Sequence, residues 1–333
     1  KVRLCMTVIG VAGCTALIVA AFGLLNSFEP MTHDQFETIY KYDAVVVPKD
    51  SGSADNLSFL TDTLDKNSNV KHSMLVSQQE CTVTHGSKVK DSDTNLVVPQ
   101  NPEKFDEIVS LHTRNGKEEL KLSDSVVMLS EKMCSELGIK TGDKITLNVD
   151  GKKAEVKVSG IFEQYIYNFV YMTPTTYKSL FGSDCTYNMA DVALKDTSDS
   201  ACDEFGSQVL SDDKIAAVSY IASSLNEFRN MLNSLDMVVT VMIICAAALA
   251  FVVLYNLTNI NIAERVREIA TFKVLGFYNR ETSSFIYKEN IILTLLGIFV
   301  GLFLGNLLTG FIIQTVEVDN VMFGLSLIHI SEP

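Results

Sequence analysis

Four histidines carry the side chains best suited to acid–base chemistry or metal binding in the long central part of the chain. They are His33, His72, His85 and His112, and they lie far apart in the sequence, without the short spacings that bind a metal. The sequence also has no Gly-x-Ser-x-Gly or His-Glu-x-x-His motif, and no Gly-x-x-x-x-Gly-Lys-Ser/Thr loop for a nucleotide phosphate. We therefore expect no catalytic residue, no metal site and no bound cofactor in this chain.

The cysteines and paired acids of the same region are interpreted as structural and surface residues. Cys81, Cys134, Cys185 and Cys202 are widely spaced without a Cys-x-x-Cys pair, so a zinc site is not expected. They could form disulfides or remain free thiols, because a domain of this length can build a core without covalent links. The acid pairs at 118–119 and 212–213 lie in polar stretches and are interpreted as solvated surface.

A third group of charged residues lies in a short stretch, 259–276, between two apolar runs. Glu264 and Arg267, like Arg265 and Glu268, are three positions apart, a spacing that adds a few tenths of a kcal/mol to a helix. Apolar residues at 262, 266 and 269 share the other face. The pattern predicts an amphipathic helix at a membrane surface, either a passive interfacial element or a contact site for a partner.

The elements that hold these residues follow from hydropathy. The chain has 333 residues, a net charge of −13 and a mean hydropathy of +0.20. Residues 6–25, 237–257 and 291–313 contain no charged side chain or histidine, and about 20 apolar residues span a bilayer core as a helix. These runs predict three membrane spans and exclude an ordinary soluble enzyme, while the acidic balance argues against a nucleic-acid binder.

Charge distribution predicts the orientation. Residues 27–236 carry 20 Lys and Arg against 33 Asp and Glu, which is the whole acidic excess of the chain. The connection 258–290 is short and contains five Lys and Arg residues, and such loops stay in the cytoplasm, whereas long domains cross regardless of charge. We expect a multi-pass plasma-membrane protein with a cytoplasmic N-terminus and with residues 27–236 outside the cell.

Local signals predict an α+β fold for the outer domain, with a small twisted sheet in the module of residues 125–182. The predicted elements are a buried strand at 43–48, a helix at 130–137 ended by Gly138, a hairpin of 144–149 and 153–159 around Asp150-Gly151, and an aromatic strand at 165–172. The expected fold class is therefore a multi-pass α-helical membrane protein with a large α+β extracytoplasmic domain between spans one and two.

Two further patterns concern helix packing. Residues 222–236 have helical apolar spacing and run into the second span without a breaker, which predicts either a stalk continuous with that span or a helix packed on its own domain. Gly297, Gly301 and Gly305 recur at every fourth residue of the third span, a pattern that allows close approach of another helix. We expect that helix to belong to this chain, with a dimer seam as the alternative.

The segment 261–276, NIAERVREIATFKVLG, resembles the signature segment of FtsX-like permeases, the membrane subunits of MacB/FtsX/Lol-type ABC transporters. The similarity continues through 289–290 and 293–295 into the third span. Residues 129–143 and 158–162 are similar to the periplasmic core domain of that family, and residues 6–23 resemble the first span of large duplicated Gram-positive members.

This resemblance implies a coupling role. In the family, the cytoplasmic segment between spans two and three contacts the ATP-binding subunit, so ATP and magnesium would be bound by that partner and not by this chain. The residues implied to make charged contacts are Glu264, Arg265, Arg267, Glu268 and Lys273, while Ile269 and Phe272 would anchor the helix and Gly276 would set its exit angle. The other expected partners are membrane lipid and another permease half or copy, without nucleic acid.

We therefore predict an ABC permease subunit that couples ATP hydrolysis to movement of the outer domain, exporting a peptide or lipid-like substrate or transmitting motion mechanically. The alternative is a membrane-anchored extracytoplasmic sensor. The expected divisions are 1–26, 27–221, 222–257, 258–290, 291–313, 314–324 and 325–333. The last of these, LSLIHISEP, resembles the translation of a sequencing adapter, so we expect a fragment that lacks the family's fourth span.

Overall fold

The computed structural model describes residues 2–50, 53–91, 93–114, 117–264, 266, 270–271, 274, 279–316 and 322. The chain divides into two compact units, which are described separately. The first comprises residues 1–29, 230–317 and 325–333, and the second comprises residues 30–229 and 318–324. Two long helices begin in one unit and end in the other.

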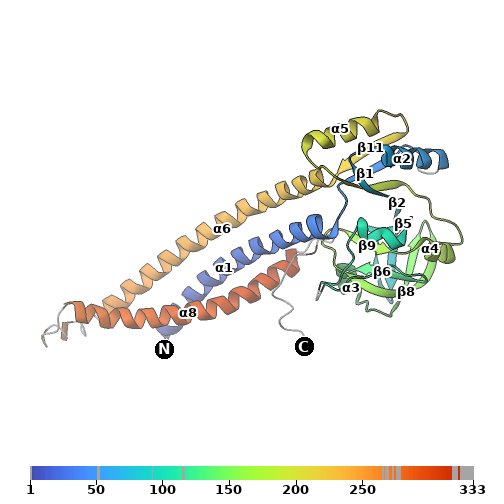
Figure 1. Cartoon of the computed structure of the whole chain (residues 1–333). Helices are drawn as coiled ribbons and strands as arrows, with labels where there is room; N and C mark the ends of the chain where they lie inside the picture. Colours follow the sequence, from blue (N-terminus) through green and yellow to red (C-terminus); the bar gives the residue numbers. More distant parts are fainter. Residues whose placement is uncertain are drawn as a thin grey trace. The chain divides into compact units, whose positions relative to one another are not determined.

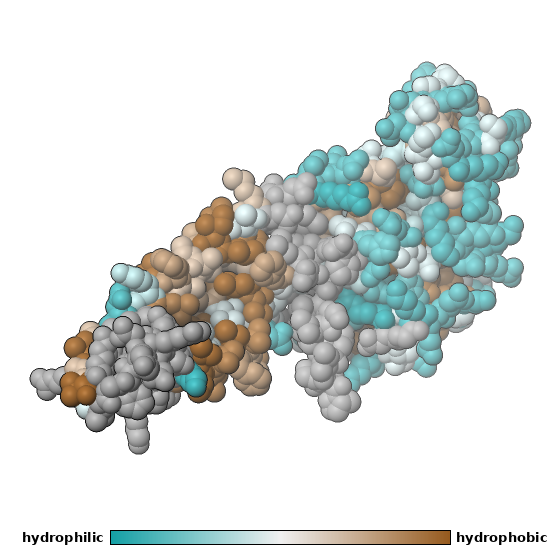
Figure 2. Space-filling view, turned by 60° about the vertical axis from the view of Figure 1, so that its left-hand side comes forward, coloured by the Kyte–Doolittle hydropathy of each residue, from teal (hydrophilic) through white to brown (hydrophobic). Residues whose placement is uncertain are grey.

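Three long helices contain the apolar runs of the first unit: α1 (Val2–His33), α6 (Ile221–Glu264) and α8 (Asn279–Val316) (Figure 1). Two segments, Val239–Asn256 and Ile291–Ile312, are long and apolar enough to cross a membrane, while the apolar part of α1 is the shorter Val8–Leu24. Apolar residues gather along these helices and polar residues over the second unit (Figure 2). The stretch at 222–236 is continuous with the second apolar run, because α6 contains both.

The glycine stripe of α8 lies against α1. A Cβ on Gly301 would lie 2.6 Å from Thr15 Cβ and 2.8 Å from the Ala12 carbonyl oxygen. A Cβ on Gly297 would lie 2.8 Å from Val11 Cβ, and one on Gly305 would lie 2.6 Å from Val19 Cβ. Real Cβ atoms do not approach so closely, so only glycine fits at these three positions. The helix that the stripe approaches is the chain's own first helix.

Two interleaved β-α-β units begin and end the second unit. Their elements are β1 (Ala44–Pro48), α2 (Ala54–Lys66), β2 (Val70–Glu80), β10 (Met189–Leu194), α5 (Asp199–Leu210) and β11 (Ile215–Tyr220). The strand order β11-β1-β10-β2, with every neighbouring pair antiparallel, is that of a split β-α-β fold. Leu60 and Leu64 of α2 and Phe205 and Val209 of α5 pack on one face of this sheet.

The rest of the domain is inserted between β2 and β10. Its elements are β3 (Thr82–His85), β4 (Lys88–Lys90), β5 (Thr94–Pro99), the 3₁₀-helix η2 (Pro102–Glu107), β6 (Val126–Ser130), α3 (Glu131–Leu137), β7 (Lys144–Val149), β8 (Lys152–Phe162), β9 (Asn168–Tyr171) and α4 (Pro174–Phe181). Its strands extend the sheet from β2 in the order β5-β9-β6-β8-β7-β3-β4. The strands of residues 125–182 lie side by side in the order β9-β6-β8-β7, and within the described residues they belong to one sheet of eleven strands that both parts share.

Local predictions agree with these elements where the signal was a turn or a cap. Gly138 ends α3 in the left-handed conformation at φ 70°, and Asp150 and Gly151 turn the β7–β8 hairpin at φ 49° and 81°. The aromatic strand begins three residues later than predicted, at Asn168. Tyr167 has a φ of 60°, and this left-handed residue interrupts an extended strand.

The domain cysteines are free thiols, which settles the alternative that the sequence left open. Cys81 and Cys134 belong to the core of the inserted part, and burial raises the pKa of each thiol to about 12. A thiol with so high a pKa forms little thiolate near neutral pH. These two residues therefore contribute to packing and not to chemistry.

Candidate functional site

A π-helical turn, η1 (Asp34–Ile39), follows α1 directly and leads toward the sheet. Gln35 and Ile39 of this turn are fully buried. The Gln35 side-chain oxygen accepts hydrogen bonds from the backbone N–H groups of Tyr165, at 2.8 Å, and Ile166, at 3.3 Å. One side chain thus attaches the continuation of α1 to a loop between β8 and β9, which we call the docking loop (residues 163–167).

The docking loop has a fixed shape. Gln164 donates from Nε2 to the carbonyl oxygen of Ile166, at 2.8 Å, and to the hydroxyl of Tyr40, at 3.1 Å. Tyr167 then takes its left-handed conformation, and the chain enters β9. A bulky residue pays a conformational cost at positive φ, which the surrounding contacts must offset. The conformation of the loop is therefore stabilised by one of its own residues, Gln164, and by Gln35 of η1.

Two residues of this loop, Glu163 and Tyr165, take part in a largely buried ionic cluster. The Glu163 carboxylate faces His112, with Oε2 3.1 Å from Nε2, and Arg114, with Oε1 3.5 Å from Nε. Tyr165 donates its hydroxyl proton to Glu163, and the same hydroxyl lies 3.3 Å from Asp34 Oδ2 on η1. The guanidinium of Arg114 also lies 5.2 Å from the centre of the Tyr165 ring. Tyr165 therefore connects the cluster to η1.

The electrostatics of the cluster favour a charged Glu163. Burial by itself raises the pKa of this carboxyl, but His112, Tyr165 and Arg114 together outweigh burial and lower it below the ordinary value. Burial and the hydrogen bond to Glu163 raise the pKa of the Tyr165 hydroxyl, which therefore stays protonated as a donor. The Glu163 carboxylate is thus surrounded by His112, Tyr165 and Arg114, an arrangement that holds these side chains in place.

A residue beyond α8 reaches the same loop. The backbone N–H of Met322 donates to the carbonyl oxygen of Tyr165 at 2.7 Å, and the Met322 side chain is buried. The turn that follows the first helix and a residue beyond the third helix therefore both bind the docking loop.

The residues predicted to contact an ATPase lie mostly outside the described part of the chain. Glu264 is the last residue of α6. Arg265, Arg267, Glu268, Ile269, Phe272, Lys273 and Gly276 lie outside the described residues. Within the described ranges, no group of three or more His, Cys, Asp or Glu residues could hold a metal ion.

Sequence reasoning missed the docking loop. His112 was treated as an isolated histidine, although it is buried against Glu163. The available signal was the acid at 163, which directly follows a strand whose residues alternate between buried and exposed. An ionisable group at that position needs a partner, but the sequence does not show that Glu163 is paired with His112 and Arg114.

Two family models match this chain. The model described as the MacB-like periplasmic core domain matches residues 4–202, and the model described as the FtsX-like permease C-terminal region matches residues 240–331. The second match extends into residues 325–331, which belong to the stretch that resembles the translation of a sequencing adapter. No match was found among curated proteins.

Three solved structures are similar to part of this chain. The periplasmic region of MacB from Actinobacillus actinomycetemcomitans is 13% identical, with a TM-score of 0.38 over 58% of this chain and 94% of that one. The extracellular domain of the ABC-type transporter YknZ from Gram-positive bacteria is 12% identical, with a TM-score of 0.34 over 54% and 98%. A domain of a permease protein from Porphyromonas gingivalis is 14% identical, with a TM-score of 0.32 over 53% and 88%.

Proposed function

Because this chain belongs to the family of ABC transporter permeases with a MacB-like periplasmic core domain and an FtsX-like membrane region, we propose that it transmits motion from an ATPase to its outer domain. It acts as a multi-pass subunit whose N-terminus and residues 258–290 are cytoplasmic. A separate ATP-binding subunit hydrolyses ATP, and the extracytoplasmic domain moves in response.

The observation that carries this proposal is the bond between Gln35 and the docking loop. The helix α1 continues into η1 without an intervening linker, and η1 is fixed to the domain by the two hydrogen bonds that Gln35 accepts. A flexible linker would absorb displacement of α1, whereas a hydrogen-bonded turn passes it on. The continuity of α6 from Ile221 supports a second rigid connection, whose first backbone N–H donates to the Asp43 carbonyl oxygen at 2.8 Å.

Mechanical transmission is favoured over transport through a polar pore. The three apolar runs contain no Asp, Glu, Lys, Arg or His, the residues that mark ion or solute pathways through a membrane. The proposed work is therefore done outside the membrane by the domain itself. A peptide or lipid-like molecule at the membrane surface is the substrate class that such a movement would displace.

The cytoplasmic contact is proposed for the segment that follows α6. Glu264, Arg265, Arg267, Glu268 and Lys273 would face the ATPase, and Ile269 and Phe272 would hold the segment on the membrane, with Gly276 at its end. An amphipathic segment of this kind places charged groups toward the cytosol and apolar groups toward lipid. It would move as one piece when a docked ATPase changes shape.

Co-purification of the tagged permease with an ABC ATPase subunit expressed with it tests the contact. Arg267→Glu should reduce the ATPase retained by the tagged permease at least about tenfold, since a reversed charge at an interface costs more than 1.4 kcal/mol. Arg229→Glu, an equal charge change at an exposed position of the outer region, should retain the ATPase as the wild type does. Equal retention by both variants would remove Arg267 from the interface.

A further inference from the structure

One acidic side chain lies beneath the segment that joins η1 to the sheet. In β10, Ala190, Val192 and Leu194 face the core formed with α2 and α5. Successive side chains of a strand point to opposite faces, so Asp191 points to the other face of the sheet. Its side chain is nevertheless buried, with 7% of the residue exposed.

Aromatic residues cover this face of the sheet. The rings of Tyr40 and Tyr42 are 5.1 Å apart, and Tyr171 of β9 packs on Phe105 at 5.2 Å and on Phe162 at 4.9 Å. The charge of Asp191 contributes to the raised pKa of Tyr40, Tyr42 and Tyr171, in each case after burial. The Asp191 carboxyl therefore lies within electrostatic range of these three phenol groups.

The tyrosines belong to the connection between helix and domain. Residues 40–43, which we call the connecting segment, follow η1 and lead into β1. Lys41 donates its backbone N–H to Ile108, and Asp43 donates its own to Val192 on β10, each at 2.8 Å. Any change in how Tyr40 and Tyr42 pack on Asp191 is therefore a change at the point where the membrane helix joins the sheet.

The surroundings of Asp191 differ from those of Glu163. The neighbours of Asp191 on the adjacent strands are Val45 and Met74, which carry no titratable group. Among the residues that the structure describes, burial is the sole cause of its raised pKa, and no cation or hydrogen-bond donor offsets it. A buried carboxylate without such partners is unfavourable, whereas the neutral acid is tolerated.

We propose that Asp191 is a proton-binding site that makes the packing of the connecting segment on the sheet depend on the pH of the surrounding solution. With the acid protonated, Tyr40 and Tyr42 pack on a neutral group. With the acid ionised, its charge must be hydrated, and the segment that covers it loosens. This inference concerns the domain itself and does not depend on the proposed ATPase coupling.

The titration range supports this role. Burial raises the pKa of Asp191 to about 7 from an ordinary value of 3.8. The folded state then holds the proton more tightly than an open state does, so the packed form weakens as the pH rises from about 4 to about 7. Tyr40, Tyr42 and Tyr171 have raised pKa values and remain neutral over this range, so Asp191 is the group that titrates.

Hydrogen exchange of the full chain in lipid nanodiscs tests the proposal. The amides of Lys41 and Asp43 are bonded across the segment, and their protection is measured at pH 5.5 and pH 8 after correction for intrinsic exchange. In the wild type, protection should fall at least about tenfold between the two pH values, as expected for a group whose pKa lies inside that interval. Asp191→Asn carries no titrating proton, so its protection should be the same at both.

A control variant separates this effect from general instability. Asp203→Asn changes an exposed acid of α5 and should keep the pH dependence of the wild type. The wild-type measurement stands alone if Asp191→Asn fails to fold. Unchanged wild-type protection between pH 5.5 and pH 8, or an equal fall in the wild type and in Asp191→Asn, would overturn the proposal.

Discussion

Two buried acids of the same domain, Glu163 and Asp191, lie in surroundings that favour opposite charge states. Glu163 is surrounded by His112, Arg114 and Tyr165, which favour its charged form. Asp191 lies under tyrosines, and its charge is opposed. Both carboxyls lie close to the connection between η1 and the sheet. The charge of each one is therefore determined by the residues around it and not by the net charge of the domain.

At the residue scale, Glu163→Gln should lower the free energy of unfolding of the domain at pH 7 by about 2–4 kcal/mol, because it leaves buried His112 without its anion and leaves Arg114 with Glu131 as its remaining carboxylate neighbour among the described residues, at 3.3 Å. The depressed pKa means that this stabilisation is present above the ordinary value of 4.5 and is lost as the pH falls through the folded value. Denaturant unfolding at pH 7 and at progressively lower pH measures both effects.

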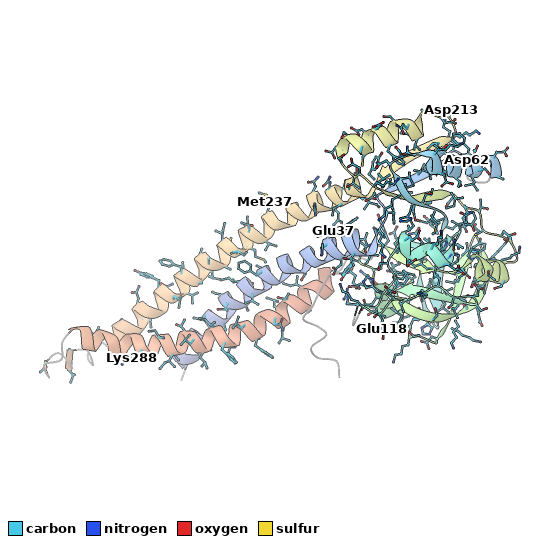
Figure 3. The ribbon with its side chains drawn as sticks, in the orientation of Figure 1. Glu37, Asp62, Glu118, Asp213, Met237 and Lys288 are labelled. Atoms are coloured by element: carbon cyan, nitrogen blue, oxygen red, sulfur yellow. The ribbon has the colours of Figure 1, made fainter. Side chains whose placement is uncertain are left out.

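The matched control is Glu118→Gln, which removes an exposed acid on the same part of the domain (Figure 3). This change should alter stability by less than about 0.5 kcal/mol, as surface substitutions usually do. If Glu163→Gln were no more damaging than Glu118→Gln, or if its effect persisted undiminished in acid, the carboxylate would not hold the cluster together.

At the element scale, the third helix depends on close contact with the first. At Gly301 a Cβ would meet both the Thr15 side chain, at 2.6 Å, and the Ala12 backbone, at 2.8 Å. Backbone atoms cannot turn away as a flexible side chain can. The two helices must therefore separate or shift if this residue becomes larger.

Gly301→Leu should destabilise the membrane unit by at least about 2 kcal/mol, the usual cost of overpacking. Thermal unfolding in detergent measures the loss. Gly310→Leu is the matched control, since a Cβ at Gly310 has no neighbouring atom within 4 Å. Equal stability of the two variants would contradict close packing of α8 on α1.

Elements formed by local chemistry were predicted from the sequence, and elements formed by distant contacts were not. Gly138 and the Asp150-Gly151 turn determine their conformations within a few residues, so α3 and the β7–β8 hairpin were identified correctly. The docking loop depends on Gln35, which is 130 residues from Tyr165. No spacing rule indicates such a pair, and the continuity of the eleven-stranded sheet across the insertion is equally non-local.

At the scale of the whole molecule, the proposed transmission has a test at Gln35. Gln35→Leu keeps the size of the side chain but removes the acceptor for the Tyr165 and Ile166 amides. In the full chain assembled with its ATPase, we expect ATP hydrolysis to continue while the ATP-dependent movement of the domain falls at least about twofold. Fluorescent amino acids at positions 118 and 288 report this movement as a change in energy transfer; Glu118 and Lys288 are both labelled in Figure 3.

Gln208→Leu controls for the loss of a glutamine, because Gln208 is exposed on α5 and its side chain bonds to Glu204 of the same helix and to nearby Asn67. Its movement signal should equal that of the wild type. A wild-type signal in Gln35→Leu as well would show that the domain is driven by another connection, and α6 would then be the candidate.

The pairing of β1 with β11 determines how the domain carries load. The chain enters the sheet at Ala44 and leaves it at Tyr220, and these two residues are opposite one another at one end of the same antiparallel ladder. Displacement of both connections together places no tension on that ladder. Separation of the connections opens it from the Ala44–Tyr220 end, one hydrogen-bonded pair at a time, which requires far less force than shearing all pairs at once. We therefore expect β1 and β11 to stay paired when the segments before Ala44 and after Tyr220 move together, and to separate when these segments are pulled apart.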